Sequence, residues 1–135
     1  MTDTKSPASV LRRLMIEPDP RTFAVCRVRS FRNVNPEAPG TFLASTGSEL
    51  SLVCPEEAVP PESEKVEPGW RMFRVAGTLD FALVGILAAI SSVLSEHRIS
   101  LFAVSTFDTD YVLVKADCYG RALEALRTNG ARIRP

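Results

Sequence analysis

The second half of the chain carries the most regular pattern of apolar and polar positions. Residues 70–76 alternate large apolar with basic side chains over part of their length, which predicts a strand. Residues 77–79 predict a turn, and the apolar run from residue 81 to 94 predicts a helix capped by Asp80, whose carboxylate can accept from first-turn N–H groups. Because a membrane span needs roughly 20 apolar residues, this shorter run predicts a buried core helix.

The pattern continues with a hairpin and a second helix. Two β-rich runs, 99–105 and 110–115, flank a polar turn and predict a pair of strands. Apolar residues at helical spacing from Tyr119 onward predict a helix that stops at Gly130, and residues 131–134 predict a last strand. The order strand, helix, strand, strand, helix, strand is the ferredoxin-like βαββαβ arrangement.

The first half repeats part of this pattern. Residues 45–53 align with residues 105–114 with one gap, since both begin Ser-Thr, pass through a short polar turn to an acid, and end in an alternating strand. Residues 23–28 correspond in the same way to the strand at 72–75. Self-similarity of this kind indicates a duplicated unit.

The first copy lacks most of the helical sequence of the second. Residues 31–40 are rich in Asn, Pro and Gly where the second copy has its core helix, and residues 55–58 suffice for one turn. Such a reduced copy could not bury enough surface alone, so we expect the two halves to share one core.

Polar segments that contain proline set the expected domain boundaries. Residues 1–20 predict a loosely held N-terminal arm, and residues 59–69 predict an acidic, proline-rich linker. These segments leave a degenerate unit at residues 21–58 and a complete unit at residues 70–135.

Composition narrows the class of protein. The chain has 135 residues, of which 45% are hydrophobic, and its 16 basic and 16 acidic residues give zero formal net charge, which argues against nucleic-acid binding. No apolar N-terminal stretch suits a signal peptide, and no segment suits a membrane span. Cys26, Cys54 and Cys118 are an odd number with no close pair, which fits reduced thiols in a cytoplasmic protein without a disulfide framework or a zinc site.

The sequence contains few of the groups and motifs that catalysis uses. His97 is the only histidine, it lies between two charged residues at a predicted helix end, and no nucleophile elbow, phosphate loop, dinucleotide fingerprint or His-Glu-x-x-His motif is present. We therefore expect no enzyme activity, no cofactor and no metal site.

Two segments of the second half carry a family resemblance. Gly77-Thr78-Leu79-Asp80-Phe81 through Gly85-Ile86-Leu87, and the stretch from Ser105 to Val114, resemble the ACT domain. They are most similar to small tandem-ACT proteins related to aspartate-kinase regulatory domains and to the cytosolic arginine sensors. The resemblance covers residues 70–134 well and residues 22–58 weakly. It implies an α+β fold of two ferredoxin-like ACT units, the first reduced and lacking most of its helices.

The resemblance also implies a ligand and a site. ACT units bind a free amino acid, usually at an interface between two units, and the turn before the first helix holds its carboxylate. That places the ligand at Thr78, Leu79 and Asp80, and the hairpin of the arginine-sensing relatives adds Thr106, Phe107, Asp108, Thr109 and Asp110. Leu83 stands where those relatives carry an acidic residue, so the identity of the amino acid stays open.

The residues themselves give this site a physical basis. A glycine-containing turn that leads into a helix N-terminus suits a carboxylate, and Asp108 or Asp110 suits an ammonium or cationic group. Phe107, exposed at a turn, favours a ligand or partner that covers it. In the alternative interpretation, Asp80 only caps the helix and the two hairpin aspartates only satisfy local backbone groups.

Three functions follow from this sequence. The first is a cytoplasmic amino-acid sensor that acts through a regulated enzyme or through oligomerisation, with a homodimer expected. The second is a dimerisation or protein-interaction module that has the ACT fold and no ligand. The third, an enzyme that uses Asp108 and Asp110, would need a carboxyl group with a strongly raised pKa in a closed pocket.

Overall fold

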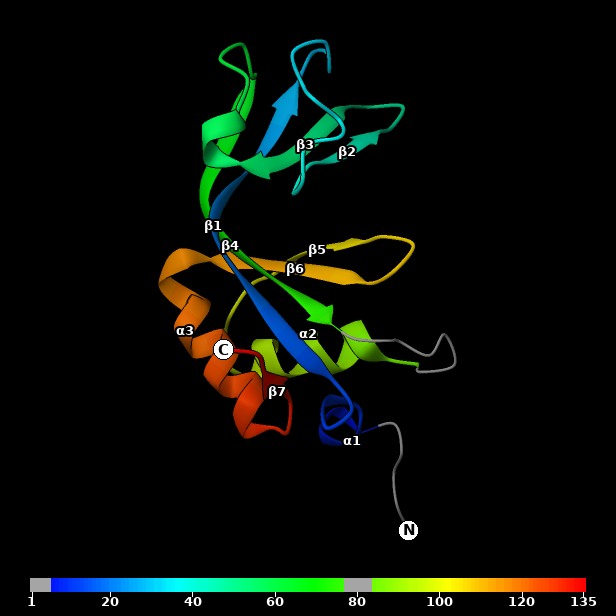
Figure 1. Cartoon of the computed structure of the whole chain (residues 1–135), viewed down its shortest axis with the longest axis vertical. Coiled ribbons are helices and arrows are strands. Elements are labelled where there is room, and N and C mark those ends of the chain that lie inside the picture. The colour runs from blue at the N-terminus through cyan, green and yellow to red at the C-terminus, as the bar shows by residue number, and fades with distance from the viewer. Residues whose placement is uncertain (1–5, 77–83) are drawn as a thin grey trace. The chain divides into compact units, whose positions relative to one another are not determined.

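The fold is mixed α/β with a largely antiparallel sheet and few helices, in a computed structural model that describes residues 6–76 and 84–135. The chain divides into two compact units (Figure 1). Unit 1 comprises the segment up to Pro20 together with Arg71–Pro135, and unit 2 comprises Arg21–Trp70. Two long strands, β1 (Met15–Val28) and β4 (Lys65–Ala76), each contribute one part to either unit.

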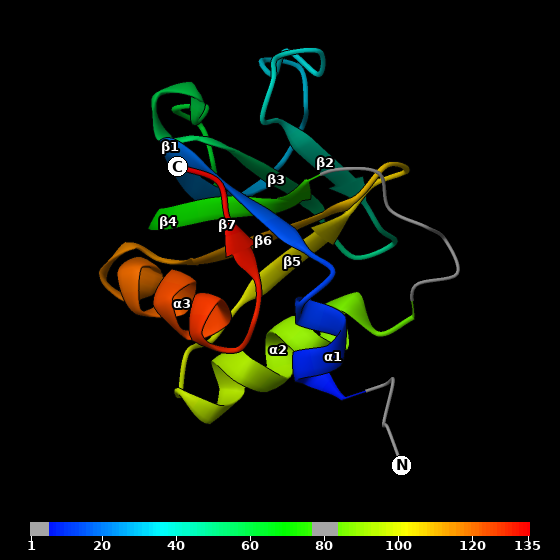
Figure 2. The same ribbon diagram turned by 60° about the horizontal axis from the view of Figure 1, so that its bottom comes forward.

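Unit 1 contains all the α-helices of the described residues. Its strands follow the order β1-β4-β6-β5, and β7 pairs in parallel with β1. Figure 2 shows the helices on one face of this sheet. The elements are α1 (Pro7–Leu11), α2 (Ile86–Glu96), β5 (Phe102–Ser105), β6 (Asp110–Lys115), α3 (Ala116–Thr128) and β7 (Arg132–Ile133).

The core of unit 1 follows from strand alternation. Phe73 and Val75 of β4, like Val112 and Val114 of β6, are fully buried on the face that carries the helices. Alternate side chains of a strand point to opposite faces, so these positions meet the apolar stripes of the helices. The helical side of the core consists of Val10, Leu11, Ala89, Ile90, Val93, Leu94, Tyr119, Ala122, Ala125 and Leu126.

The segment that we expected to be a loose arm is part of unit 1, so that prediction is wrong for residues 6–20. The Ser6 hydroxyl caps α1 by accepting from the Ser9 N–H, and both Leu14 and Ile16 are completely buried. The adjoining part of β1 lies between β4 and β7 in the strand order. The unit expected at residues 70–135 is therefore completed by the N-terminal segment.

The core helix begins later than its apolar run predicts. The N-cap of α2 is Gly85, whose left-handed backbone (φ 86°) separates the helix from the preceding residues, and Val84 is 72% exposed. The cap that we predicted at Asp80 lies outside the described residues. The rest of the order holds, since β6, α3 and the stop at Gly130 (φ 113°) lie where the pattern places them.

Unit 2 arranges its strands in the same way as unit 1 arranges its equivalent strands. It has no α-helix over residues 21–70, all of which are described. Its strands follow the order β2-β3-β1-β4, where β2 is Phe42–Ser45 and β3 is Leu50–Pro55. One 3₁₀ turn, η1 (Glu56–Ala58), stands where unit 1 has α3. The expected linker at residues 59–69 is wrong over its second half, because β4 begins at Lys65.

Each unit has a cluster of buried apolar side chains in its described residues. Unit 1 holds the larger one, and unit 2 holds its own cluster on β1 and β3, made of Ala24, Cys26, Val28, Leu52 and Cys54. The expected sharing of one core by the two halves stays a prediction. No helix in the described ranges is long and apolar enough to span a membrane.

Candidate functional site

The hairpin of β5 and β6 carries five of the eight predicted site residues. Thr106 closes its turn, since its N–H donates to the Thr109 carbonyl at 2.9 Å and its hydroxyl donates to the same oxygen at 3.1 Å. Ser105 and Asp110 face each other across the strands, and the Ser105 hydroxyl donates to Asp110 Oδ1 at 2.6 Å. These bonds fix both the turn and the Asp110 carboxylate.

Thr109 fastens this turn to β4. Its side chain is buried, with 7% of the residue exposed, and its hydroxyl donates to the Val75 carbonyl at 2.6 Å. Val75 lies two residues before Gly77, so the hairpin turn is held beside the point where the chain leaves β4. The other predicted site residues, Thr78, Leu79 and Asp80, lie outside the described residues.

The tip of the turn presents an aromatic ring and a carboxylate to solvent. Phe107 is 87% exposed, and Thr106 and Asp108 are also exposed, whereas Asp110 is half-buried. The structure thus brings one phenyl ring and two carboxylates to one turn of unit 1. This combination of a phenyl ring and two carboxylates suits a ligand that carries a positively charged group and a second group that can pack over the ring.

The first hairpin, β2–β3, reproduces the same backbone frame. Thr46 N–H donates to the Glu49 carbonyl at 3.0 Å, as Thr106 does to Thr109. Every strand pair recurs with both numbers raised by 60, from Phe42↔Val53 to Phe102↔Leu113 and from Ser45↔Leu50 to Ser105↔Asp110. The alignment needs no gap, so the one-residue gap of our sequence alignment is wrong.

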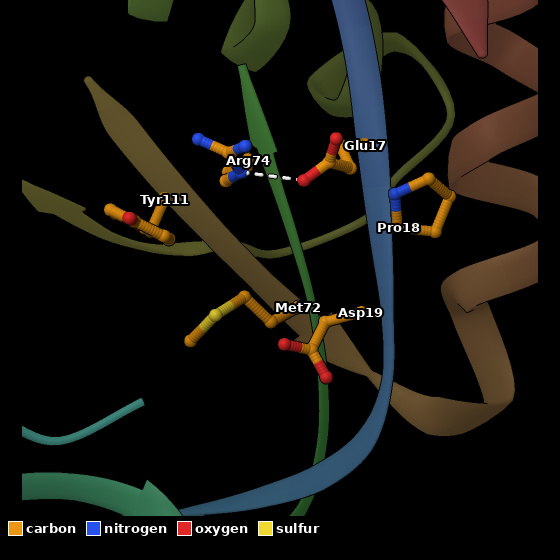
Figure 3. A pocket seen from close by; sticks show the side chains of 6 residues that line it. All are labelled: Glu17, Pro18, Asp19, Met72, Arg74 and Tyr111. Carbon is orange, nitrogen blue, oxygen red and sulfur yellow. Dashed lines mark hydrogen bonds and ion pairs between the residues drawn. The ribbon is translucent and has the colours of Figure 1, made fainter. Parts of the chain in front are cut away.

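Unit 1 also contains a small pocket beside an ion pair, drawn in Figure 3. The pocket has a volume of about 60 Å³. Glu17 and Arg74 point toward each other within it, with Glu17 Oε1 at 2.8 Å from Arg74 Nε, and Arg134 also pairs with Glu17. Small-molecule pockets measure roughly 300–1,000 Å³. This pocket is therefore too small for an amino acid; its lining residues are Glu17, Pro18, Asp19, Met72, Arg74 and Tyr111.

The two arginines favour the charged form of the Glu17 carboxylate. The hydrogen bond from Arg74 lowers the pKa of Glu17, against a smaller opposing effect of desolvation, and Arg134 adds to the lowering. Sequence reasoning missed this cluster because its members lie 57 and 117 residues apart in the chain. No local pattern marks such a pair.

A wider groove lies at the C-terminal end of α2. It has a volume of about 500 Å³, and Arg98 is its only charged lining residue. A free amino acid needs an acceptor for its ammonium as well as a donor for its carboxylate, and this lining offers no carboxylate. The groove therefore fits an amino acid less well than the hairpin turn; its other lining residues are Ser91, Ser95, Ile99, Ser100 and Leu101.

The three cysteines are free thiols and belong to no cluster of metal-ligating side chains in the described parts of the chain. Cys26 and Cys54 are buried in unit 2, and burial raises the pKa of the Cys54 thiol to about 12. Cys118 is half-buried, and Arg121 Nη2 lies 3.5 Å from its sulfur. Within the described ranges, no three His, Cys, Asp or Glu side chains gather as metal ligands would.

Comparison with known proteins identifies the fold family. Residues 65–128 match the family model of the ACT domain. The human protein "Cytosolic arginine sensor for mTORC1 subunit 1" is 41% identical over 59 residues, which are 43% of this chain and 18% of the sensor. This chain thus matches less than a fifth of the length of that relative.

Two solved structures resemble nearly the whole chain. The protein Atu0741 from Agobacterium tumefaciens is 27% identical with a TM-score of 0.78, over 90% of this chain and 92% of that chain. The aspartate kinase of Clostridium acetobutylicum is 15% identical with a TM-score of 0.63, over 85% of this chain and 34% of that chain, and at this identity the likeness concerns the fold alone. Residues 65–128 thus match the ACT domain, and the two solved structures have a similar fold over nearly the whole of this chain.

Proposed function

We propose that this protein is an amino-acid-binding regulatory protein whose ligand binds at the β5–β6 turn of unit 1. The observation that carries the proposal is the turn from Ser105 to Asp110, which Thr109 fixes to β4 and which presents Phe107, Asp108 and Asp110 together. The bonded turn backbone and the Asp110 carboxylate, which accepts from Ser105, are pre-organised for a cationic group, which reduces the entropic cost of binding.

The roles follow from the chemistry of a free amino acid. Asp108 and Asp110 accept from its ammonium, and the ring of Phe107 covers part of its side chain. The backbone N–H groups of Thr78, Leu79 and Asp80, which follow β4 in the sequence, donate to its carboxylate. The name of the human relative, a cytosolic arginine sensor, supports an amino acid as ligand and the cytoplasm as location.

Regulation requires a second surface, through which the protein contacts another copy of itself or a regulated enzyme. The protein acts without catalysis of its own, as a homodimer or through a regulated enzyme, and ligand binding selects one of two states of that assembly. The two units are duplicated ferredoxin-like ACT units, the first reduced, because the two hairpins share one frame.

A second candidate function is a protein-interaction module without a ligand. Strand β5 is the last strand in the sheet order of unit 1, and no charged residue occurs between Ile99 and Phe107. An uncharged edge strand is a site where a further strand can pair. This function predicts a stable assembly that does not respond to amino acids.

A thermal-shift screen separates the two functions. Each of the twenty amino acids is added at about 10 mM; a ligand that binds about a hundredfold more tightly than this concentration stabilises the fold by about 2.7 kcal/mol. For a domain of this size the melting temperature then rises by several degrees. We expect a selective rise with wild type and its loss in Asp110→Ala. A flat response from folded wild-type protein contradicts the sensor function and supports the interaction module.

A further inference from the structure

We infer that the groove at the C-terminal end of α2 is an anion site, in which Arg98 and the hydroxyls of Ser95 and Ser100 bind a phosphate group. The ligand is inorganic phosphate or a small phosphate monoester, and the site is independent of the proposed amino-acid site. Two observations carry the inference. They are the set of side chains that line the groove and the backbone conformation in which Arg98 is held.

Arg98 occupies a position whose backbone conformation favours glycine. Its φ is 57°, and among the described residues it is the only non-glycine residue with a positive φ. The turn that ends α2 imposes this conformation, because the Arg98 N–H donates to the Ser95 carbonyl at 3.0 Å and the Ile99 N–H donates to the Leu94 carbonyl at 2.9 Å. A side chain in the left-handed region lies too close to the backbone, so the arginine costs stability.

Glycine closes the equivalent turn after α3. The N–H groups of Gly130 and Ala131 donate to carbonyls three and five residues earlier, at 3.1 and 3.0 Å, as those of Arg98 and Ile99 do. Glycine is the usual residue at the left-handed position of such a turn. The turn itself therefore does not need an arginine, and a side chain that is kept in a strained conformation points to a role outside the turn.

The groove offers hydrogen-bond donors and no negative charge. Arg98 is its only charged lining residue, and among the described residues no carboxylate forms an ion pair with its guanidinium. The Ser91 hydroxyl donates to the Ala88 carbonyl at 3.2 Å. The other two lining hydroxyls, those of Ser95 and Ser100, therefore remain as donors for a ligand.

These donors suit a phosphate group better than a carboxylate. The guanidinium of Arg98 can donate two parallel hydrogen bonds to two phosphate oxygens, and a phosphate has a further oxygen that can accept from a hydroxyl. The volume of about 500 Å³ lies within the range of small-molecule pockets and exceeds what the ion alone fills. A phosphate monoester therefore fits the groove as well as free phosphate does.

The helix dipole does not account for Arg98. A positive charge is favourable at the C-terminal end of a helix, but any position in the last turn of α2 would provide it without a left-handed backbone. Arg121 already brings a guanidinium to this end, since its Nη1 donates to the His97 carbonyl at 3.2 Å. The Leu94 carbonyl accepts from the N–H groups of His97 and Ile99. The charge of Arg98 thus stays available to a ligand.

Substitutions at position 98 separate the charge from the backbone strain. Arg98→Gln removes the charge and keeps the strain, Arg98→Gly removes both, and Arg32→Gln, at an exposed arginine of unit 2, is the matched control. Two-dimensional ¹H–¹⁵N NMR follows titrations with inorganic phosphate and with glycerol 3-phosphate at constant ionic strength.

In wild type and Arg32→Gln we expect saturable shifts of the amide signals of residues 91–101, with a dissociation constant on the order of 1 mM. The signals of residues 125–131, at the end of α3, should stay in place. Arg98→Gln should weaken binding by about tenfold or more, because it removes a charge-assisted hydrogen bond. Tighter binding of glycerol 3-phosphate identifies a monoester site, and equal affinity identifies a site for free phosphate.

Thermal unfolding without phosphate measures the strain. Arg98→Gly should melt a few degrees above wild type, whereas Arg98→Gln should melt close to it. The inference is overturned if residues 91–101 of wild type show no saturable shift, or if Arg98→Gln binds phosphate as tightly as wild type. An Arg98→Gly protein that melts below wild type would show that the arginine serves the turn itself, which also overturns the inference.

Discussion

At the scale of single residues, Thr109 links the candidate site to the fold. Its hydroxyl satisfies the Val75 carbonyl at 2.6 Å in a buried position. This bond holds the turn that carries Phe107, Asp108 and Asp110, so in the proposed site Thr109 acts as a positioning residue.

Replacing Thr109 with valine tests this link. Thr109→Val keeps the shape but leaves a buried carbonyl without its donor, which costs about 1–3 kcal/mol of unfolding free energy. Urea denaturation measures this loss, and Thr128→Val, an exposed threonine at the end of α3, serves as the control, with a change within about 0.5 kcal/mol. Equal stability of the two variants would contradict the anchoring role of Thr109.

The ion pair of Glu17 makes the free energy of unfolding depend on pH. Hydrogen bonding from Arg74 lowers the pKa of Glu17 in the folded state, so its contribution is present above the unfolded pKa, near 4.3, and is lost as the pH falls through the folded value. Between pH 5 and pH 3 wild type should lose more unfolding free energy than Glu17→Gln does.

Denaturation with urea at several pH values gives this comparison directly. Glu96→Gln, which changes an exposed glutamate at the end of α2, is the matched control and should follow the wild-type curve. Parallel curves for wild type and Glu17→Gln would show that the pair with Arg74 and Arg134 does not stabilise the fold.

At the scale of elements, the sequence predicted correctly those helices and strands that short-range patterns encode. Strand β6 and the end of α3 were predicted correctly, because alternation, helical spacing and Gly130 are local signals. The loose arm was predicted in place of α1 and the start of β1, since five helical residues carry no periodicity and Leu11 becomes apolar core only against other elements. The start of α2 was misplaced because Gly85 was taken as part of an apolar run rather than as a left-handed N-cap.

The candidate site also has some features that the local sequence predicts and others that it does not. The hairpin turn and the pairing of Ser105 with Asp110 follow from the polar residues between two β-rich runs. The bond from Thr109 to Val75 does not, because it joins residues 34 apart whose approach depends on strand order. A gapless comparison of the two halves would have aligned the two turns residue by residue, with Phe107 at the position of Gly47.

Two glycines test the boundary of α2 against an ordinary helical position. Gly85 has φ 86° and open space around its Cβ position, so Gly85→Ala should lose about 1 kcal/mol through backbone strain alone. Gly120 lies inside α3, also with open space, and Gly120→Ala should gain about 0.5–1 kcal/mol. Chemical denaturation gives both values; a gain in Gly85→Ala would contradict the left-handed N-cap.

At the scale of the whole molecule, the two units share one hairpin frame and differ in the elements around it. Unit 1 keeps the helices, the larger core and the anchored turn, while unit 2 keeps the sheet and a smaller apolar cluster. The ligand site that we propose lies in unit 1, although both units share the hairpin geometry.

The most direct test of amino-acid binding at the β5–β6 turn is a titration followed by two-dimensional ¹H–¹⁵N NMR. Labelled full-length protein is titrated with the amino acid that raises its melting temperature most, or with a mixture of all twenty if none does. The account predicts shifts of the amide signals of residues 105–110 and 78–80, while the equivalent signals of residues 45–50 stay in place. An unchanged spectrum, or shifts that spare residues 105–110, would contradict it.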